Sequence, residues 1–515
     1  MHRAYALAVS EISLTKHGAK MKSHIETWLL CVIASVFLFG CASDRPYRTR
    51  LVDVGDVECP LHSAGTLERC SNVTPETGQG YELHFVEFDD QGWMPTLDNE
   101  SPTAGNTSQN QIDHLMNRLD KLLDENSSYL NIIVYVHGWK HDARSDDSDV
   151  ERFRQVLASA RTLERGGKDN PRKVVGIYVG WRGKSWNLPG PLINLSFWSR
   201  KAAALRVSHG TVQELFARLR TVQQYYNSRT ASPDCATPRE GRLTTGGCRV
   251  RTLMIGHSFG AWILYSAMSG QIMATLNAER DLDAQLDQHG KDDTTGREHA
   301  AKGVANRRPA EMIVLINPAF EAVRYQPVHQ AAINYKNRVA QPPILVTITS
   351  TADLATKDAF PAGRFLNSIF ERPVTSEEQN EAMTHTHGHI ELYQTHELIR
   401  IASEPCPGWQ KPGPLSSSDK DQILKNKAIE VENSARFFNQ YTQDNGLLRP
   451  WVRDFCGGVR LVQLKQSDPR QNRDPNSLVW NIRTDASLIP GHSEIMGDEF
   501  LEFVRQLYDD TELQH

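Results

Sequence analysis

The chain has 515 residues, of which 39% are hydrophobic and 23% are charged. These fractions are ordinary for globular proteins and exclude a largely disordered chain. A mean hydropathy of −0.48 excludes a protein built of many membrane-spanning helices. The formal charge is −5, and the chain has no basic stripe that would neutralise phosphates, so we expect no nucleic-acid partner.

An apolar run near the N-terminus is the first segment that indicates a function. Trp28 to Gly40 contains 13 residues without a charge, which is too short for a helix that spans a bilayer core. Basic residues precede the run and small residues follow it, as is typical of an export signal. We therefore expect residues 1–41 to be a signal peptide. Met21 begins a better-proportioned signal and is a candidate for the true start.

The end of this run, Leu38-Phe39-Gly40-Cys41, resembles a bacterial lipobox. The resemblance implies that the Cys41 thiol is diacylated and that this residue becomes the first of the mature protein. A lipid anchor would hold the protein at a membrane surface without a spanning helix. Ala42 stands where Asp is the usual mark for inner-membrane retention, so we expect an outer-membrane lipoprotein of the cell envelope. A short hydrophobic anchor with a chance cysteine is the alternative.

Cys31 lies in the predicted signal, and the six cysteines that follow Cys41 agree with export. They form three neighbouring couples along the chain: Cys59 with Cys70, Cys235 with Cys248, and Cys406 with Cys456. An even number without a CxxC pair favours disulfides in an oxidising compartment over metal ligands. Pairing between sequence neighbours is one of many arrangements that six cysteines allow, so the connectivity stays open.

Strand and helix patterns alternate after residues 42–80, a polar stretch that we expect to be a tether. Short apolar runs typical of buried parallel strands recur along the chain. They lie at 81–88, 131–136, 174–179, 252–255, 312–316, 344–348 and 478–482. Helical periodicity separates most of them, for example at 111–123, 150–163 and 211–225. The alternation predicts an α/β fold with a mostly parallel sheet and helices on both faces.

Two stretches are too long for single crossovers between strands. They comprise residues 186–249 and 360–475, and the second is rich in polar and helical segments. We expect both to be lid-like insertions above the sheet, within one domain that covers residues 81–515.

The sharpest motif is Gly256-His257-Ser258-Phe259-Gly260, which follows a strand pattern and opens a helix pattern. A serine on a strained strand-to-helix turn is lifted above the sheet edge, and a Cβ at either flanking glycine would strike the strand or the helix. Ser258 is therefore a candidate nucleophile. A helix cap without chemistry is the alternative.

In this context the chain resembles the α/β-hydrolase family over most of residues 81–515. Val136-His137-Gly138-Trp139, directly after an apolar strand, supports the resemblance. In the family, an HG-x turn at this place donates one backbone N–H to the oxyanion hole, and the residue after the nucleophile donates the other. The resemblance implies that these amides belong to Trp139 and Phe259. A tight strand-to-loop turn without this role is the alternative.

The family's chain order is serine, then acid, then histidine. Asp353 follows the apolar run at 344–348 and is the candidate acid, with Asp358 in reserve. The alternative for Asp353 is a helix N-cap. His492 follows the run at 478–482 and precedes an amphipathic helix, so it is the candidate base. A surface histidine before a helix is the alternative.

Four histidines crowd into the second long stretch: His385, His387, His389 and His396. His389 and His396 are seven residues apart and could share a helix face as metal ligands. No cysteine or carboxylate cluster completes a ligand set, so we expect neither a metal nor a cofactor. Packing inside a lid is the commoner use of such histidines, and one of them as the catalytic base is a further alternative.

The resemblance implies a serine hydrolase, most often one that cleaves carboxylic esters, with a small molecule or a lipid as substrate. Several aromatic residues could line an acyl site or simply pack: Trp139, Trp181, Trp186, Phe197, Trp198 and Trp262. Two other classes remain open, a non-catalytic binding or scaffolding protein of the cell envelope and a metal-dependent hydrolase that uses the histidines. The complete order of Ser258, Asp353 and His492 favours the serine hydrolase.

Overall fold

The computed structural model describes most of the predicted domain and a few residues before it. The described ranges are 46–48, 76–77, 80–95, 110–124, 128–167, 171–184, 196–229, 248–289, 308–333, 342–367, 377–401, 425, 429–430, 432, 434, 452–464 and 477–511. The predicted signal peptide, including Cys41, lies outside them. Within these ranges no helix has the length and apolarity needed to cross a membrane.

The described strands form one 11-stranded sheet in the order β1-β2-β4-β3-β5-β6-β7-β11-β8-β10-β9. The strands are β1 Glu76–Thr77, β2 Glu82–Phe88, β3 Leu130–Val136, β4 Lys173–Trp181, β5 Val250–His257, β6 Met312–Ile316, β7 Leu345–Ser350, β8 His396–Arg400, β9 Val452–Phe455, β10 Val459–Gln463 and β11 Val479–Thr484. Neighbouring strands from β2 to β8 in this order are parallel, whereas β1, β9 and β10 pair antiparallel. The predicted α/β fold with a mostly parallel sheet is confirmed.

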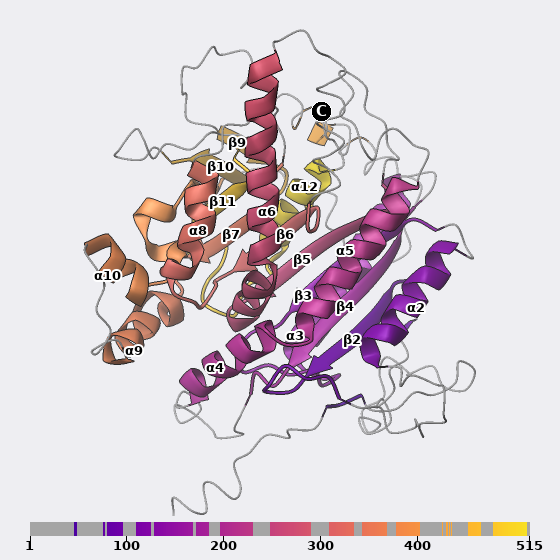
Figure 1. Cartoon of the computed structure of the whole chain (residues 1–515), viewed down its shortest axis with the longest axis horizontal. Coiled ribbons are helices and arrows are strands. Elements are labelled where there is room, and N and C mark those ends of the chain that lie inside the picture. Colours follow the sequence, from indigo (N-terminus) through magenta and orange to yellow (C-terminus); the bar gives the residue numbers. More distant parts are fainter. Residues whose placement is uncertain are drawn as a thin grey trace, which may run out of the picture.

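Helices cover both faces of the sheet. They are α2 Gln111–Asp124, α3 Ser148–Gly167, α4 Phe197–Ser208, α5 Val212–Ser228, α6 Phe259–His289, α8 Ala322–Ile333, α9 Phe360–Asn367, α10 Glu377–Thr384 and α12 Asp498–Asp510. In Figure 1, α2, α5 and α6 lie across the near face of the sheet. Their apolar side chains form one core cluster, while α3 and α12 contribute to a second cluster with the other strand faces.

Strand β3 shows why both faces are needed. All seven of its residues are buried, with Ile132 and Val134 in the first core cluster and Ile133 and Tyr135 in the second. Successive side chains of a strand point to opposite faces, so a continuous apolar run can be buried only between two helical layers. The buried runs are therefore the reason that the sheet is sandwiched.

The first long stretch is not a lid throughout. The described part of residues 186–249 includes α5, whose Leu215, Phe216 and Leu219 are fully buried in the first core cluster. Asn227 near the end of α5 also exchanges hydrogen bonds with the backbone of Val250 at the start of β5. The expectation of an insertion above the sheet is therefore wrong for α5, which is a crossover helix on the sheet face.

The second long stretch also differs from the expected lid. Between 360 and 475, the described residues include β8, β10 and β9, which extend the sheet beyond β11. Their burial alternates, as in His396–Arg400, because only one side of these short strands faces the core. Such half-buried strands lack the continuous apolar run that identified the central ones.

Parts of the expected tether, residues 42–80, also belong to the folded domain. Glu76–Thr77 form β1 and pair with β2. Arg48 is only 4% exposed and contacts β2 and the loop after β3. The tether prediction is wrong at these positions because polar and charged residues here find buried partners instead of solvent.

Candidate active site

Ser258 occupies a sharp turn between β5 and α6. Its backbone φ of +56° lies in the left-handed region, where residues other than glycine are strained. The two neighbouring glycines make this turn sterically feasible. A Cβ on Gly256 would lie 2.7 Å from the Cα of Ala261 in α6, and one on Gly260 would lie 2.1 Å from the carbonyl oxygen of Val136 in β3. The turn therefore has the close packing that the motif predicted.

The three predicted triad residues meet at the carboxyl edge of the sheet. The Nε2 atom of His492 lies 2.7 Å from Ser258 Oγ, and its Nδ1 atom lies 2.8 Å from Asp353 Oδ2. Ser258 follows β5, Asp353 follows β7 and His492 follows β11. His492 keeps 19% of its side chain exposed while Asp353 is completely buried. A neutral imidazole can thus accept the serine proton on one side and donate to a carboxylate on the other.

Four donors hold the Asp353 carboxylate. Oδ1 accepts from the backbone N–H groups of Ala355 and Thr356, at 3.0 and 3.2 Å. Oδ2 accepts from His492 and from Thr356 Oγ1, the latter at 2.5 Å. Burial alone would raise the pKa of Asp353, but the hydrogen bonds and charge of His492 and the bonds from Thr356 outweigh it and hold the pKa below its usual value. Asp353 therefore both caps the turn that follows and faces His492.

The reserve acid lies elsewhere. Asp358 belongs to the short π-helical turn Ala355–Ala359 and is exposed. Among the hydrogen bonds between described residues, none joins it to His492, and the contact predicted for an acid belongs to Asp353.

One histidine of the predicted cluster stands behind the acid. His389 Nε2 lies 2.9 Å from Thr356 Oγ1, the same hydroxyl that donates to Asp353. A hydroxyl that donates to a carboxylate can only accept from the ring, so His389 carries its proton on Nε2. Burial lowers the pKa of His389 to about 4, which keeps the ring neutral. Sequence reasoning missed this support because the two residues are 33 positions apart.

The backbone of His492 is fixed as well. Its carbonyl oxygen accepts hydrogen bonds from His257 Nε2 at 2.8 Å and from Asn317 Nδ2 at 3.1 Å. Burial, followed by the neighbouring His492, lowers the pKa of His257 well below its usual value, so this ring stays neutral. Asn317 adopts a φ of +44° directly after β6 and accepts from the Ser350 N–H. Neither residue carried a signal in the sequence beyond its position next to a strand end.

The two expected oxyanion-hole amides, of Trp139 and Phe259, belong to two segments that meet at Ser258. Phe259 is the first residue of α6, so its N–H has no acceptor within the helix. Trp139 follows Gly138, where a Cβ would lie 2.9 Å from Ser258 Cβ. Between described residues, no hydrogen bond uses either N–H group. Two free donors beside a serine hydroxyl are suited to stabilise a developing oxyanion.

Aromatic rings surround these amides. Phe197 at the start of α4 contacts Trp139, Phe259 and Phe360, with ring centroids 5.2, 4.8 and 6.2 Å apart respectively. Trp198 packs against Phe197 at 5.1 Å. We call these five residues the aromatic cluster: Trp139, Phe197, Trp198, Phe259 and Phe360. Phe259 and Phe360 are fully buried within it.

The other predicted aromatic residues have different surroundings. Trp181 stacks on His137 and donates from Nε1 to its carbonyl oxygen, which fixes the turn that carries Trp139. Trp262 is buried in α6 and stacks on Phe320. Trp186 lies outside the described residues.

The remaining clustered histidines are used in packing. His387 is buried, stacks on Tyr325 at 4.1 Å and lies 3.2 Å from Thr347 Oγ1. His385 lies beside Thr384 Oγ1, and His396 beside Thr395 Oγ1. His389 ends a short 3₁₀ turn while His396 begins β8, so the shared helix face considered for a metal does not exist. None of the four belongs to a group of described residues spaced for a metal.

Two of the predicted disulfide cysteines are described, and both are disulfide-bonded: Cys248 and Cys456. The other four predicted disulfide cysteines lie outside the described ranges: Cys59, Cys70, Cys235 and Cys406. Disulfide formation agrees with the predicted oxidising compartment, and the pairing of the couples stays a prediction.

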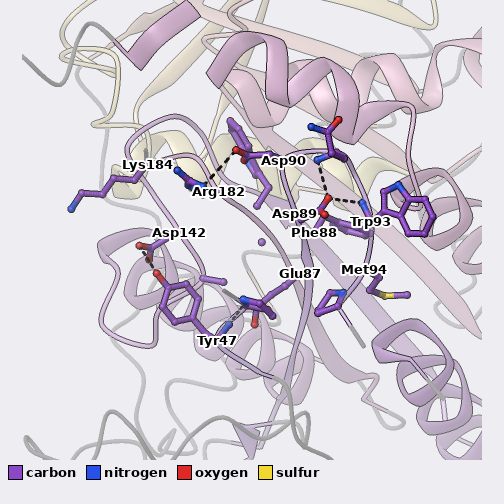
Figure 2. Close-up of a pocket in the computed structure, with 16 residues that line it drawn as sticks. Tyr47, Glu87, Phe88, Asp89, Asp90, Trp93, Met94, Asp142, Arg182 and Lys184 are labelled. Atoms are coloured by element: carbon purple, nitrogen blue, oxygen red, sulfur yellow. Dashed lines mark hydrogen bonds and ion pairs between the residues drawn. The ribbon is translucent and has the colours of Figure 1, made fainter. Parts of the chain in front are cut away.

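A cavity of about 410 Å³ lies near the turn that carries Trp139, between the ends of β2 and β4. Figure 2 shows two of its polar pairs, with Arg182 beside Asp90 and the Tyr47 hydroxyl on Asp142. Trp181 joins this cavity to the turn because it lines the cavity and stacks on His137. The triad residues are not part of its lining.

No protein-family model matches the chain, and no curated protein or solved structure is significantly similar to it. Evidence for a function therefore comes from the sequence motifs and from the geometry of the candidate site.

Proposed function

We propose that the protein is an exported serine hydrolase of the α/β-hydrolase type that cleaves carboxylic esters. The observation that carries the proposal is the hydrogen-bonded chain from Ser258 through His492 to Asp353, at 2.7 and 2.8 Å. Its members follow β5, β7 and β11 in the chain order of that family.

The mechanism follows from the atoms present. His492 Nε2 takes the Ser258 proton as Oγ attacks the ester carbonyl, and the oxyanion is bound by the N–H groups of Trp139 and Phe259. Asp353 stabilises the imidazolium that forms. The ester C–O bond then breaks, and the alcohol leaves with the proton from His492. Water, deprotonated by His492, attacks the acyl-enzyme, and return of the proton to Ser258 Oγ releases the acid.

An ester is favoured over other acyl donors by family frequency alone, while the aromatic cluster suits a hydrophobic acyl chain. Export and lipid attachment at Cys41 are part of the same proposal, supported by the disulfide-bonded state of Cys248 and Cys456. No metal or cofactor is needed for any step.

The test is hydrolysis of p-nitrophenyl esters of increasing chain length by the exported protein and by its Ser258→Ala variant. We expect activity that disappears in the variant, and the chain-length profile would define the acyl site. Equal activity of both proteins would contradict Ser258 as the nucleophile.

A further inference from the structure

The N-terminal strap, Pro46–Arg48, is docked on the edge of the sheet where Ser258 lies. Arg48 Nη1 donates to Glu87 Oε1 at 3.1 Å and to the carbonyl oxygen of Ala143 at 2.7 Å. The Tyr47 N–H donates to the other Glu87 oxygen at 2.7 Å. Glu87 precedes the last residue of β2, and Ala143 follows the turn that carries Trp139. The strap is thus fixed between the carboxyl end of β2 and the loop that follows the turn carrying Trp139.

This docking limits the distance between the apolar N-terminal run and the candidate active site. The run ends at Gly40, and only five peptide steps separate Cys41 from Pro46. A fully extended chain covers about 3.5 Å per residue, so the two Cα atoms lie within roughly 18 Å of each other. A membrane that holds the chain at Cys41 therefore has to lie close to the strap.

The same edge exposes large apolar side chains. Trp93, after β2, is 73% exposed and lines the cavity that Pro46 also lines. Leu354, next to Asp353, is 64% exposed, and Phe365 in α9 is 66% exposed. Val323 in the first turn of α8 is exposed as well. We call these four residues the apolar edge.

The opposite edge provides a contrast. Of the seven large apolar side chains that the described residues expose, four belong to the apolar edge, and one, Tyr225, lies near the amino end of β5. The other two are Ile429 and Val452. Figure 1 shows α4 and α9 along the side toward which the arrow of β2 points, while the far end of α5 lies at the other side. Four of the seven therefore lie on the side of the molecule that carries the carboxyl ends of the parallel strands, which is also the side on which the strap is docked.

We propose that the apolar edge rests on the lipid surface to which the N-terminus is attached. The proposal rests on the proposed function and names its substrate class, an ester of a long acyl chain embedded in that lipid. Tryptophan prefers the membrane interface because its ring is apolar and its N–H is polar. With the edge at the interface, an acyl chain can pass from the lipid to the aromatic cluster without crossing water, which avoids the cost of its hydration.

The first experiment measures depth in the membrane without any turnover. The full chain in a Ser258→Ala background receives a fluorophore at Trp93→Cys, at Phe365→Cys or at the control position Tyr225→Cys. Each anchored protein is placed in vesicles of phosphatidylethanolamine and phosphatidylglycerol that contain nitroxide-labelled lipid. We expect quenching at positions 93 and 365 to exceed that at position 225 at least fivefold. Equal quenching at the three positions, or none at 93 and 365, would overturn the proposal.

The second experiment uses the active enzyme. The double variant Trp93→Ser and Phe365→Ser should lose at least fivefold in hydrolysis of a long-chain ester embedded in vesicles. Its hydrolysis of water-soluble p-nitrophenyl acetate should stay within twofold of the native rate, and Tyr225→Ser should change neither rate. A similar loss on both substrates, or no loss on vesicles, would contradict the membrane-facing edge. Absence of hydrolysis by the native protein would instead reject the proposed function and leave the quenching result as the test of orientation.

Discussion

Ser258 and Asp353 are held in place by different means. The nucleophile turn depends on backbone packing, because Gly256 and Gly260 allow α6 and β3 to approach without a Cβ between them. The acid depends on directed hydrogen bonds from Thr356 and His492, with His389 behind them. Steric exclusion can be encoded within five consecutive residues, whereas a hydrogen-bond relay recruits residues from distant parts of the chain.

The largest effect is expected from the acid. Asp353→Asn keeps the size of the side chain but removes the charge that favours the imidazolium, so kcat should fall by on the order of 10³ to 10⁴. Steady-state hydrolysis of a p-nitrophenyl ester measures this loss. Asp358→Asn is the matched control, since Asp358 is exposed five residues away, and it should retain nearly native activity. Equal losses in the two variants would remove the distinction between Asp353 and its neighbour.

The next effect concerns the packing of the nucleophile turn. In Gly260→Ala the new Cβ would lie 2.1 Å from a backbone oxygen of β3, so the turn has to shift. A displacement of about 1 Å costs roughly 10²-fold in rate, which should appear in kcat at an unchanged far-ultraviolet spectrum. Gly270→Ala in the same helix is the control, because its Cβ would have no neighbour within 4 Å. Native activity of Gly260→Ala would show that the glycine is not needed.

A smaller effect is expected from the relay. Thr356→Val removes the hydroxyl that donates to Asp353 while keeping the side-chain shape, and kcat should fall about tenfold, as a lost hydrogen bond to a charged group is worth about 1.5–3 kcal/mol. Thr356→Ser restores the hydroxyl and should recover most of the rate. If valine and serine variants behave alike, the hydroxyl does not support the acid.

The last prediction concerns stability in acid. Burial lowers the pKa of His387 to about 3 and that of His389 to about 4, from an ordinary value of 6.5. The unfolded chain therefore binds protons that the folded chain does not as the pH falls below 6.5. Stability should be complete above that pH and should be lost toward pH 4, by up to about 1.4 kcal/mol per pH unit for each histidine.

Urea unfolding at several pH values between 7 and 4.5 measures this slope. His389→Gln should reduce the slope of the unfolding free energy against pH. The reduction should correspond to at most one proton fewer taken up on unfolding. His209→Gln, at an exposed position after α4, should leave the slope as in the native protein. A native slope in His389→Gln would mean that the ring is protonated in the folded state.

The contrast between the packed Ser258 turn and the hydrogen-bonded Asp353 also explains which features could be predicted from the sequence. Ser258, Asp353 and His492 each follow a buried parallel strand, so the apolar runs gave both the sheet and the order of these residues. The short strands β8, β9 and β10 lack such runs because one side of each is only partly buried. Predicting a lid for the second long stretch was wrong at these three strands for this reason.

Contacts between distant polar residues could not be predicted in the same way. His389 reaches Thr356, Asn317 reaches the His492 carbonyl, and Arg48 reaches Glu87 only after the fold is formed. Each of these residues is a common loop or surface type whose partner depends on tertiary packing. Local patterns therefore identified the groups proposed to react, but not the groups that hold them.

The most direct test of the central claim is covalent labelling of the intact protein with a fluorophosphonate, which reacts with activated serines. We expect one adduct by mass spectrometry, on the peptide that contains Ser258, no adduct in Ser258→Ala and much slower labelling in His492→Gln. Absence of labelling in the folded native protein, or an adduct that persists in Ser258→Ala, would contradict an activated nucleophile at this turn.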